Sequence, residues 1–450
     1  MTTSKTIIQD FKAGKYEIVI ATASRMIEEA PAHDLAWRAL GAALLETGNT
    51  DAAITALRKS LIASPSAAET YFNLANALMK DNSCVHPLDM YRRAVQLSPL
   101  FTEANNNLGN ALKDFHRLDE SIAAYQKALT ANPSYVEAFW NIAIIKLTQR
   151  KFSVGWRMYE WRWRKSHLEA EWIAGIHLAW DGTSSLEGKI LLLDSEQGLG
   201  DSIQFFRFLT RLPVQAGNVI VRVEEPLIRL FRASLSIAPL SNVSVVSKSD
   251  TLPRFDRHCA LMSLPYLLKL TPDDLAIQAP YLKAADQPTR NTPIESNAKQ
   301  IRRVGLVWSG NPRLANDRNR SISLSKLLPC LPQGPQYFAI QKEVRSSDVE
   351  VFRTSNLIDT SSQLQDFYDT ARLCETMDLI ISVDTSVAHL AGSLFVQTWL
   401  LLPFTADWRW GTNGTTTVWY PTITLYRQSE DRSWDPVIRS VMSDLSKVLS

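Results

Sequence analysis

One aspartate follows a glycine-bearing turn in the segment LLLDSEQGLGDSIQFFRF, residues 191–208. The pattern predicts a buried strand, a turn containing Gly198 and Gly200, and an amphipathic helix that begins near Asp201. Such turns often bind phosphate through free backbone N–H groups, a task for which a carboxylate is unsuited. Asp201 fits two other tasks, because a carboxylate at a helix start can cap the helix or take a proton from an attacking hydroxyl. The helix dipole keeps the carboxylate ionised in either case.

The same turn does not complete the dinucleotide fingerprint. Gly198 and Gly200 match the first two glycines of Gly-x-Gly-x-x-Gly, but Ile203 stands where the third belongs. That third glycine allows close packing of the helix on the strand. The sequence therefore argues against NAD binding.

A second polar group follows the apolar run LIISV near residue 380. Asp384 ends this predicted strand, Thr385 and Ser386 open the next helix, and His389 lies one turn further on. Free N–H groups at a helix start bind phosphate, and hydroxyls add donors. We expect a phosphate-bearing ligand here, with capping by Asp384 and Thr385 and a core role for His389 as the alternatives.

Further candidates follow neighbouring predicted strands. In open α/β sheets, ligands lie at the carboxyl ends of the strands. The loop WSGNP comes after one strand, the polar segment NDRNRS continues it, and AIQKE ends the next strand. The ligand-binding candidates in these segments are Ser309, Asn311, Arg318, Arg320, Gln341 and Lys342. A solvated loop is the alternative for the arginines. In the loop after TWLLLP, Trp408, Arg409 and Trp410 suit either ring stacking on a ligand or ordinary packing.

Two series of strands alternate with helices and must position these residues. The first series is predicted at KILLLD, NVIVRV, NVSVVS and within RHCALMSL, and the second at RRVGLVWSG, QYFAIQ, LIISVD, TWLLLP and TITLYR. Alternation of strands and helices indicates parallel sheets. A polar stretch at 284–300 is expected to link two Rossmann-like halves that enclose a cleft.

The first third of the chain repeats with a period of 34 residues. Prolines 31, 65, 99 and 133 keep this spacing, as do Leu40, Leu74, Leu108 and Ile142 with the small residue that follows each. The pattern resembles the tetratricopeptide repeat, a pair of antiparallel helices, over residues 1–165. Pro87 and Ser121 depart from it, which predicts a distorted second helix in repeat two. The aromatic end, VGWRMYEWRWRK, is expected to dock on the next domain.

Asparagines recur on one face of the repeats. We call them the asparagine ladder: Asn73, Asn107 and Asn141 at one repeat position, and Asn76 and Asn110 three residues along. Asparagine is a poor helix former, so its recurrence needs a reason. A side-chain amide both donates and accepts, which suits the backbone of an extended peptide. Hydrogen bonds between neighbouring repeats are the alternative. The ladder resembles that of tetratricopeptide-linked protein O-GlcNAc transferases, although repeat one has Ala39 instead.

Composition excludes several classes of protein. The net charge is +2 with no dense basic block, which argues against a nucleic-acid partner. Apolar runs are too short for a transmembrane segment, and the polar N-terminus lacks a signal peptide. The four cysteines lie far apart, without a metal or redox motif, and fit a reducing cytoplasm. The expected location is cytoplasmic.

Residues 165–450 resemble heptosyltransferase-like glycosyltransferases of GT-B fold, in the repeat-linked bacterial form. The resemblance rests on SEQGLGDSIQFFRF, RVGLVWSGNPRLANDRNRSISL and DLIISVDTSVAHLAGSL with LLPFTADWRWG. It implies that Asp201 is the general base on the acceptor side and that the C-terminal half binds the donor. It also implies inversion at the anomeric carbon. The chain contains no Asp-x-Asp triplet, so we expect arginines and helix N-termini, without a metal, to stabilise the leaving phosphate.

The expected architecture is a tetratricopeptide superhelix at 1–165, an acceptor-side Rossmann-like half at 166–290 and a donor-side half at 291–450. The expected activity is transfer from a nucleotide sugar, with no cofactor, to a Ser or Thr hydroxyl of a protein bound by the repeats. Similar repeat-linked transferases imply flagellin as the acceptor and a CMP-activated nonulosonic acid as one donor, with UDP-, ADP- and GDP-sugars open. A glycan or lipopolysaccharide core transferase and an inactive scaffold are the alternatives.

Overall fold

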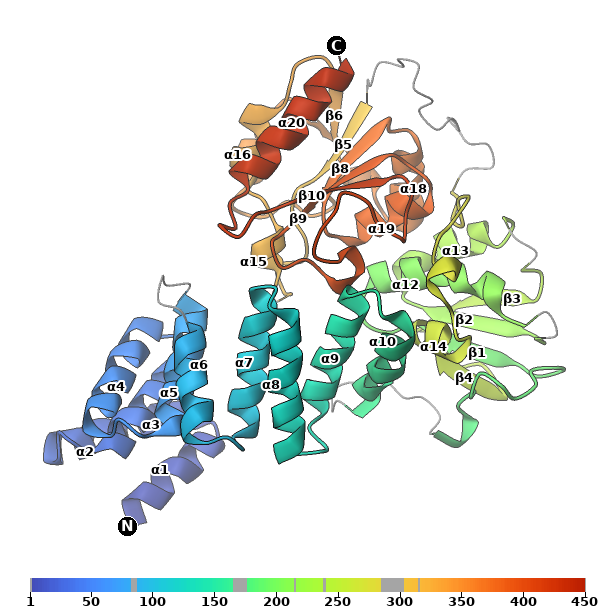
Figure 1. Cartoon of the computed structure of the whole chain (residues 1–450). Helices are drawn as coiled ribbons and strands as arrows, with labels where there is room; N and C mark the ends of the chain where they lie inside the picture. Colours follow the sequence, from blue (N-terminus) through green and yellow to red (C-terminus); the bar gives the residue numbers. More distant parts are fainter. Residues whose placement is uncertain are drawn as a thin grey trace. The chain divides into compact units, whose positions relative to one another are not determined.

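The structure is a computed structural model that describes residues 2–81, 87–164, 176–213, 216–237, 240–284, 303–314 and 316–449 (Figure 1). The chain divides into two compact units, residues 1–145 and 146–450. The predicted linker at 284–300, apart from Ala284, lies outside the described residues, as do the proposed boundaries near 165 and 290 and Cys84. The three described cysteines are unbridged.

The first unit consists of helix pairs. Each pair corresponds to one predicted repeat, and a further pair, α1 and α2, precedes them. The helices are α1 (Thr2–Lys12), α2 (Tyr16–Glu29), α3 (Asp34–Glu46), α4 (Thr50–Ala63), α5 (Ala68–Asp81), α6 (Pro87–Leu97), α7 (Thr102–Asp114), α8 (Leu118–Ala131) and α9 (Val136–Thr148). Helix α6 is described from Pro87, directly after residues 82–86, which lie outside the described residues, so the distortion predicted for repeat two stays a prediction.

Small residues at the recurring position allow the two helices of a pair to pack closely. A Cβ atom added to Gly109 would lie 2.5 Å from the Tyr125 ring. One added to Gly41 would lie the same distance from Leu57. These contacts explain why the repeat pattern has glycine or alanine there, because a larger side chain would force the helices apart.

The second unit contains two parallel sheets. The first comprises β1 (Leu191–Asp194), β2 (Val219–Val223), β3 (Val243–Ser247) and β4 (Arg257–Ala260), in the order β3-β2-β1-β4. The second comprises β5 (Arg303–Val307), β6 (Gln336–Ala339), β7 (Ile358–Asp359), β8 (Leu379–Val383), β9 (Thr398–Leu402) and β10 (Ile423–Arg427), in the order β10-β9-β8-β5-β6-β7. The sequence had indicated every strand except the two-residue β7.

Both sheets are doubly wound. If β5 is counted as strand 1 of its half and the sheet is read from β7, the second sheet has the order 3-2-1-4-5-6. The first sheet, read from β3, has the order 3-2-1-4, which is the same for the strands it contains. The order reverses between β1 and β4 in one sheet and between β5 and β8 in the other. Those switch points are where open α/β sheets bind ligands.

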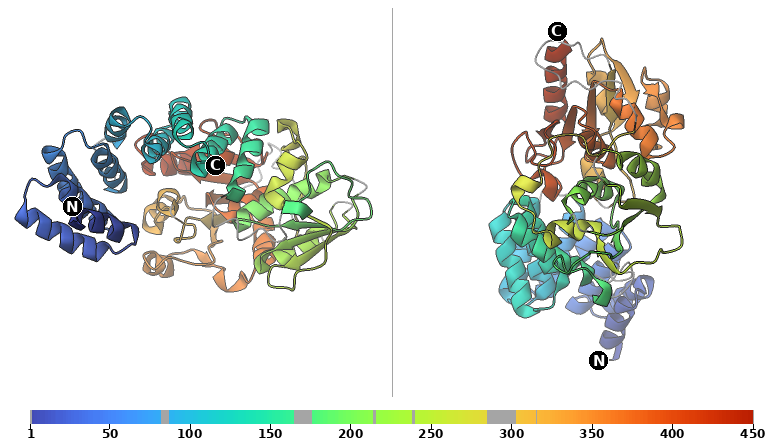
Figure 2. Two further views of the ribbon diagram at one scale, coloured as in Figure 1. Left: turned by 90° about the horizontal axis from the view of Figure 1, so that it is seen from below. Right: turned by 90° about the vertical axis from the view of Figure 1, so that its right-hand side faces the viewer.

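Helices cover the sheets and place the loops. The N-terminal half contains α12 (Leu199–Phe205), α13 (Ile228–Ser234) and α14 (Leu264–Leu267). In the C-terminal half, α16 (Leu324–Leu327) and α20 (Asp435–Leu449) lie on one face of the sheet, and α18 (Phe367–Glu375) and α19 (Ser386–Ser393) lie on the other (Figures 1 and 2). Two short helices, α15 (Asp317–Arg320) and α17 (Val349–Arg353), follow strand ends. Several 3-10 turns complete the unit: η1 (Glu160–Arg164), η2 (Ile176–Leu178), η3 (Phe206–Arg211), η4 (Glu225–Leu227), η5 (Leu261–Ser263), η6 (Pro272–Asp274), η7 (Leu328–Cys330), η8 (Ser361–Gln363) and η9 (Trp408–Trp410).

The core of the C-terminal half explains the buried strands. Leu306, Ile381 and Leu401 of adjacent strands pack against Val441 and Leu445 of α20. Burial on both faces accounts for the continuous apolar runs that the sequence shows, since parallel strands covered by helices have no solvent face.

The last repeat helix belongs to the second unit. Helix α10 (Phe152–Tyr159) follows the division in the chain, and its Trp156 ring contacts Phe205 of α12 at 5.8 Å and Trp408 at 5.3 Å. Phe152 contacts Trp419 at 5.9 Å. The aromatic end of the repeats thus docks on both halves of the following region, as its composition predicted. Within the described residues, no helix is sufficiently long and apolar to cross a membrane.

Candidate functional site

Asp201 lies in the first turn of α12. Its Oδ2 accepts a hydrogen bond of 2.9 Å from the Gly198 N–H, which closes the turn on itself. Its Oδ1 accepts a hydrogen bond from Arg409 of the other half. The side chain is 19% exposed, so its burial is incomplete. Asp201 therefore caps the turn and remains the candidate base.

Arg409 is the partner that sequence reasoning could not assign to Asp201. Its guanidinium also donates to Asp407 Oδ1 at 2.9 Å and to Gln204 Oε1 at 2.5 Å, and only 7% of the side chain is exposed. It lies 4.3 Å from the centroid of the Trp408 ring. Two carboxylates from different segments thus share one buried cation, which offsets the cost of burying it.

Burial raises the pKa of Asp201 above its ordinary value, while the Arg409 guanidinium and the Gly198 N–H act in the opposite direction. A raised pKa makes a carboxylate a stronger base once it is ionised. Burial thus increases the basicity of this candidate base, and one arginine stabilises its ionised form.

The two halves meet beside Asp201. A Cβ added to Gly200 would lie 3.1 Å from the His389 ring and 3.3 Å from the Ser386 Cα, so glycine allows α12 to approach α19. The candidate residues of the N-terminal turn and of the DTSVAH segment are therefore adjacent. Sequence reasoning placed them on facing halves, and the packing of α12 on α19 brings them together.

His389 is buried and packs parallel to Trp410, with ring centroids 5.2 Å apart. Its Nδ1 is 3.0 Å from the Tyr420 hydroxyl, which is 3.5 Å from the Tyr281 hydroxyl. Arg207 donates to Tyr281 at 3.2 Å. Because arginine can only donate, this chain of contacts favours Tyr420 as the donor to Nδ1 and leaves the proton of the neutral ring on Nε2.

Burial lowers the pKa of His389 well below its ordinary value, and Arg409 and Arg207 lower it further. The ring therefore stays neutral at physiological pH. A neutral ring with its proton on Nε2 is a hydrogen-bond donor and is not a cation. Of the two interpretations offered by the sequence, the structure shows a buried, hydrogen-bonded histidine that lies next to the candidate site.

The loop after β5 is held by Gln341. Its amide accepts from the Ser309 N–H at 3.3 Å and donates to the Ser309 carbonyl at 3.1 Å, so the predicted donor-binding glutamine shapes the loop. The Ser309 side chain is 2% exposed, and its hydroxyl has no partner among the described residues. The same is true of the Gln204 Nε2 beside Arg409. Buried polar atoms without partners are costly, so each is available for a ligand or a water.

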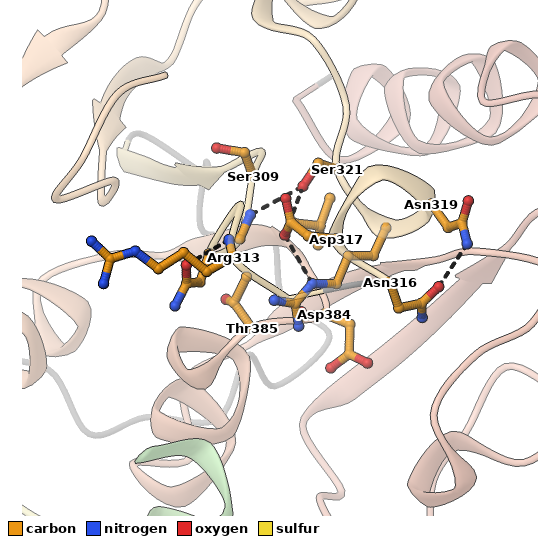
Figure 3. A network of polar contacts seen from close by, with 12 residues as sticks. Ser309, Arg313, Asn316, Asp317, Asn319, Ser321, Asp384 and Thr385 are labelled. Carbon is orange, nitrogen blue, oxygen red and sulfur yellow. Dashed lines mark hydrogen bonds and ion pairs between the residues drawn. The ribbon is translucent and has the colours of Figure 1, made fainter. Parts of the chain in front are cut away.

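Asp317 organises the polar segment that follows. The carboxylate is 4% exposed and binds Arg320 at 3.2 Å and Arg345 on its other oxygen. Arg345 also donates to Ser321 at 2.8 Å, and sequence reasoning missed it because it lies 28 residues from Asp317. Figure 3 shows Asp317 and Ser321 facing each other. The two arginines carry more charge than Asp317 neutralises, which favours an anionic ligand nearby.

Arg320 connects this segment to the other side of the switch point. Its Nη1 donates to the Asp384 carbonyl at 2.8 Å, and a Cβ on Gly310 would lie 2.5 Å from its Nη2. Arg318 is exposed, and within the described part of the chain it has no hydrogen bond or ion pair. In Figure 3 the Arg313 side chain points away from Asp384 and Thr385. The structure thus holds Arg320 by contacts with Asp317 and the Asp384 carbonyl and leaves Arg318 exposed.

The other predicted donor-side residues differ in their contacts. Asn311 is exposed and accepts from the Arg313 N–H at 3.0 Å, which shapes the turn. Lys342 is exposed and donates to the Gln365 carbonyl at 2.9 Å. Neither residue contacts the Asp201 turn or the start of α19 in the described structure. A donor-binding role for Asn311 and Lys342 therefore stays a prediction.

Thr385 precedes α19 without capping it. Its hydroxyl is 3.4 Å from the Ser382 hydroxyl and makes no capping bond to the helix, and no other side chain within the described ranges does so. The first N–H groups of α19 are therefore not satisfied by a cap. Burial, and after it the Asp407 carboxylate, raise the pKa of Asp384 to about 7 against the opposing effect of Arg320. Asp384 is thus partly protonated near neutral pH. In the described residues, no group of three or more His, Cys, Asp or Glu side chains is arranged to hold a metal.

The asparagine ladder is partly occupied by bonds between repeats. Asn107 donates to Asn76 at 3.0 Å, and Asn141 donates at 3.2 Å to Asn106, a residue outside the predicted ladder. Asn73 has no hydrogen-bond partner among the described residues, and each ladder side chain is half-buried. The inter-repeat alternative is therefore observed at two steps, and the remaining amide groups keep the capacity to bind a peptide.

Comparisons with known proteins bear on the repeats. Residues 34–77 and 102–135 each match a family model for the tetratricopeptide repeat. Protein FlbA of Caulobacter vibrioides is 24% identical over 331 residues, which are 67% of this chain and 54% of FlbA, so the chain spans about half the length of that relative.

Solved structures show limited similarity. MamA has a TM-score of 0.33 at 20% identity, over 36% of this chain and 96% of MamA. YrrB, described as a TPR protein with an unusual peptide-binding site, has a TM-score of 0.32 at 18% identity, over 38% of this chain and 90% of YrrB. What the comparisons and the described helices establish is a tetratricopeptide-repeat region followed by an α/β region with two parallel sheets, and such repeats suggest a role in binding proteins.

Proposed function

We propose that the chain is a glycosyltransferase that moves a sugar from a nucleotide sugar to a hydroxyl of a protein held by the repeats. The observation that carries the proposal is the approach of the Asp201 turn to the uncapped start of α19, through Gly200. A proton acceptor and an anion-binding helix end then lie on two facing Rossmann-like halves. That arrangement suits transfer between two substrates, one on each half.

The transfer step assigns a role to each side. The acceptor hydroxyl oxygen forms a bond to the anomeric carbon and releases its proton to Asp201. The bond between the anomeric carbon and the donor phosphate oxygen breaks, and the electron pair leaves with the nucleotide. A base within hydrogen-bond reach of the hydroxyl is the requirement on the acceptor side. Attack from the face opposite the phosphate inverts the anomeric centre.

The leaving phosphate requires positive charge and donors, which several groups of the C-terminal half supply. We assign this role to the N–H groups that open α19, to the Thr385 and Ser386 hydroxyls, and to Arg320, with the exposed Arg318 as a further candidate. The unpartnered Ser309 hydroxyl adds a donor at the end of the adjacent strand. Arg320 and the backbone N–H groups of α19 are held in place before reaction, so they stabilise developing charge without reorganising. The proposed step uses no metal and no cofactor.

Binding of the acceptor protein is assigned to the repeats. The unoccupied amides of the asparagine ladder would bind the backbone of an extended segment, whatever its side chains. Flagellin is the acceptor to try first, on the basis of the family resemblance, and a cytoplasmic location follows from the same proposal. A glycan acceptor would leave those amides without a partner.

A thermal-shift screen of nucleotides on the full chain tests the proposal. A ligand that binds only the folded state raises its stability by about 2.7 kcal/mol at 100 times its Kd. We expect one nucleoside mono- or diphosphate to raise the Tm, and its sugar conjugate then to be consumed when an acceptor protein is present. A chain that binds no nucleotide would be a scaffold, and one that glycosylates only a free glycan would support the alternative transferase.

A further inference from the structure

A tyrosine recurs in the second helix of successive repeats. Tyr91 and Tyr125 lie 34 residues apart, in α6 and α8. Each hydroxyl donates to an asparagine fifteen residues earlier, Tyr91 to Asn76 at 2.6 Å and Tyr125 to Asn110 at 2.7 Å. The bond therefore closes each repeat on itself.

The last repeat lacks that acceptor. Tyr159 is the next tyrosine in the series, and the residue fifteen positions before it is Ile144. The Tyr159 hydroxyl instead pairs with the amide of Gln197, donating at 3.2 Å to Oε1 and accepting at 3.0 Å from Nε2. The repeat tyrosine is thus redirected to the turn that leads to Asp201.

Gln197 is the residue in this turn that most needs support. Its φ is +63°, in the left-handed region, where a residue other than glycine pays about 1 kcal/mol or more. Such backbone persists only where surrounding contacts hold it. The amide pair with Tyr159 is one such contact, made by a ring that is 1% exposed.

The preceding residue is held by the same segment. Glu196 is 2% exposed and accepts two hydrogen bonds from Arg162 of η1, at 2.9 Å to Nε and 2.5 Å to Nη2. Arg162 is itself fully buried and donates to Ser263, in the loop after β4, at 2.7 Å. Tyr159 and Arg162 at the end of the repeats thus bind the loop after β1, and Arg162 also binds the segment after β4, at the switch point of the N-terminal sheet.

We propose that Tyr159 and Arg162 are positioning residues for Asp201, so that the last repeat helix sets the geometry of the candidate base. The turn from Glu196 to Asp201 is held at its start by these two side chains and at its end by the bond from Gly198 to Asp201. The catalytic part of this inference rests on the proposed function, whereas the mechanical part does not.

The substitution Tyr159→Phe tests it, because the ring and its packing stay and only the hydroxyl is lost. The matched control is Tyr125→Phe, the same deletion at the equivalent position of the preceding repeat. Hydrogen exchange, read by mass spectrometry on peptides that cover 195–205, should be several-fold faster in Tyr159→Phe and unchanged in the control. In the transferase assay, kcat at saturating acceptor should fall about tenfold in Tyr159→Phe alone, with the Kd for the donor nucleotide unchanged.

A second variant guards against an effect on the aromatic core. Gln197→Met removes the other partner of the pair from an exposed position and should increase exchange in the same peptides, and the double variant should show less than the sum of the two effects. Equal exchange in Tyr159→Phe and the control would overturn the inference. Faster exchange with unchanged kcat would overturn the catalytic role. If no transferase activity exists, the exchange data alone decide whether Tyr159 holds the turn, so the two failures are distinguishable.

Discussion

Replacement of Asp201 by asparagine separates a general base from a helix cap. Asparagine caps a helix about as well as aspartate, so the bond from the Gly198 N–H is retained. What disappears is the negative charge and nearly all of the basicity. General-base catalysis contributes a factor of about 10² to 10⁴ in rate, which corresponds to about 3 to 5 kcal/mol in the barrier.

The stability change should be smaller, for a reason visible in the structure. Arg409 would keep Asp407 at 2.9 Å and Gln204 as partners, so it would not become an unpaired buried charge. The loss is the difference between a charged and a neutral hydrogen bond, about 1 kcal/mol. Removal of a carboxylate whose pKa is raised by burial offsets part of that loss. The effect on rate therefore exceeds the effect on stability by at least about 2 kcal/mol.

Single-turnover transfer with saturating donor and acceptor measures the chemical step. The control is Asp407→Asn, which removes the other carboxylate from Arg409 and should cost similar stability but less than tenfold in rate. If the Asp201→Asn enzyme turned over within threefold of the unaltered enzyme, Asp201 would be a cap and another group would have to take the proton.

Three further predictions concern other parts of the chain. Arg320→Ala or Thr385→Ala should weaken binding of the donor nucleotide about tenfold in calorimetry, and EDTA should leave turnover intact; loss of activity with EDTA and recovery with a divalent ion would contradict the metal-free step. Replacement of Asn73, Asn107 and Asn141 of the asparagine ladder by alanine should weaken acceptor binding by about 1 kcal/mol per lost contact and leave nucleotide binding unchanged. An unchanged acceptor Kd would count against a peptide-binding role of the ladder. Because the pKa of Asp384 is raised to about 7, its contribution to stability is complete below about pH 4 and is lost as the pH rises through 7. Asp384→Asn should therefore gain stability relative to the unaltered chain between pH 5 and pH 8 in urea titrations, and parallel curves would show that the carboxyl is not buried as described.

The sequence predicted helices and strands better than it predicted side-chain contacts between distant segments. Strands covered on both faces are apolar throughout, so nearly every strand could be located, whereas β7, with two exposed residues, carries no such signal. The 34-residue period identified the repeats because each unit must present the same small and large residues to its neighbours. These features are local or periodic, so they can be recognised in a single amino-acid sequence.

Contacts between distant segments could not be predicted in the same way. Asp201 and Arg409 are 208 residues apart, and neither sequence motif predicts a contact with the other. Gln341 looked like a ligand-binding residue at a strand end, and only the fold shows its amide bound to the Ser309 backbone. The ladder asparagines had two physical uses from the start, and geometry assigned some of them to bonds between repeats. In each case an amide or carboxylate can bind several kinds of partner, so the residue type alone does not determine which partner it binds.

Arg207 has a consequence for the order in which the chain matures during synthesis. Its buried guanidinium donates to the Leu275 carbonyl at 3.0 Å and to the Trp419 carbonyl at 2.8 Å, and the second acceptor lies 212 residues downstream. At about 5 to 20 residues per second, a ribosome needs roughly 10 to 40 s to reach it. Throughout that interval the nascent N-terminal half has a cation without one of its final acceptors, and Asp201 has no Arg409. The repeats can therefore be folded and open to a protein partner while the candidate site is still unfinished.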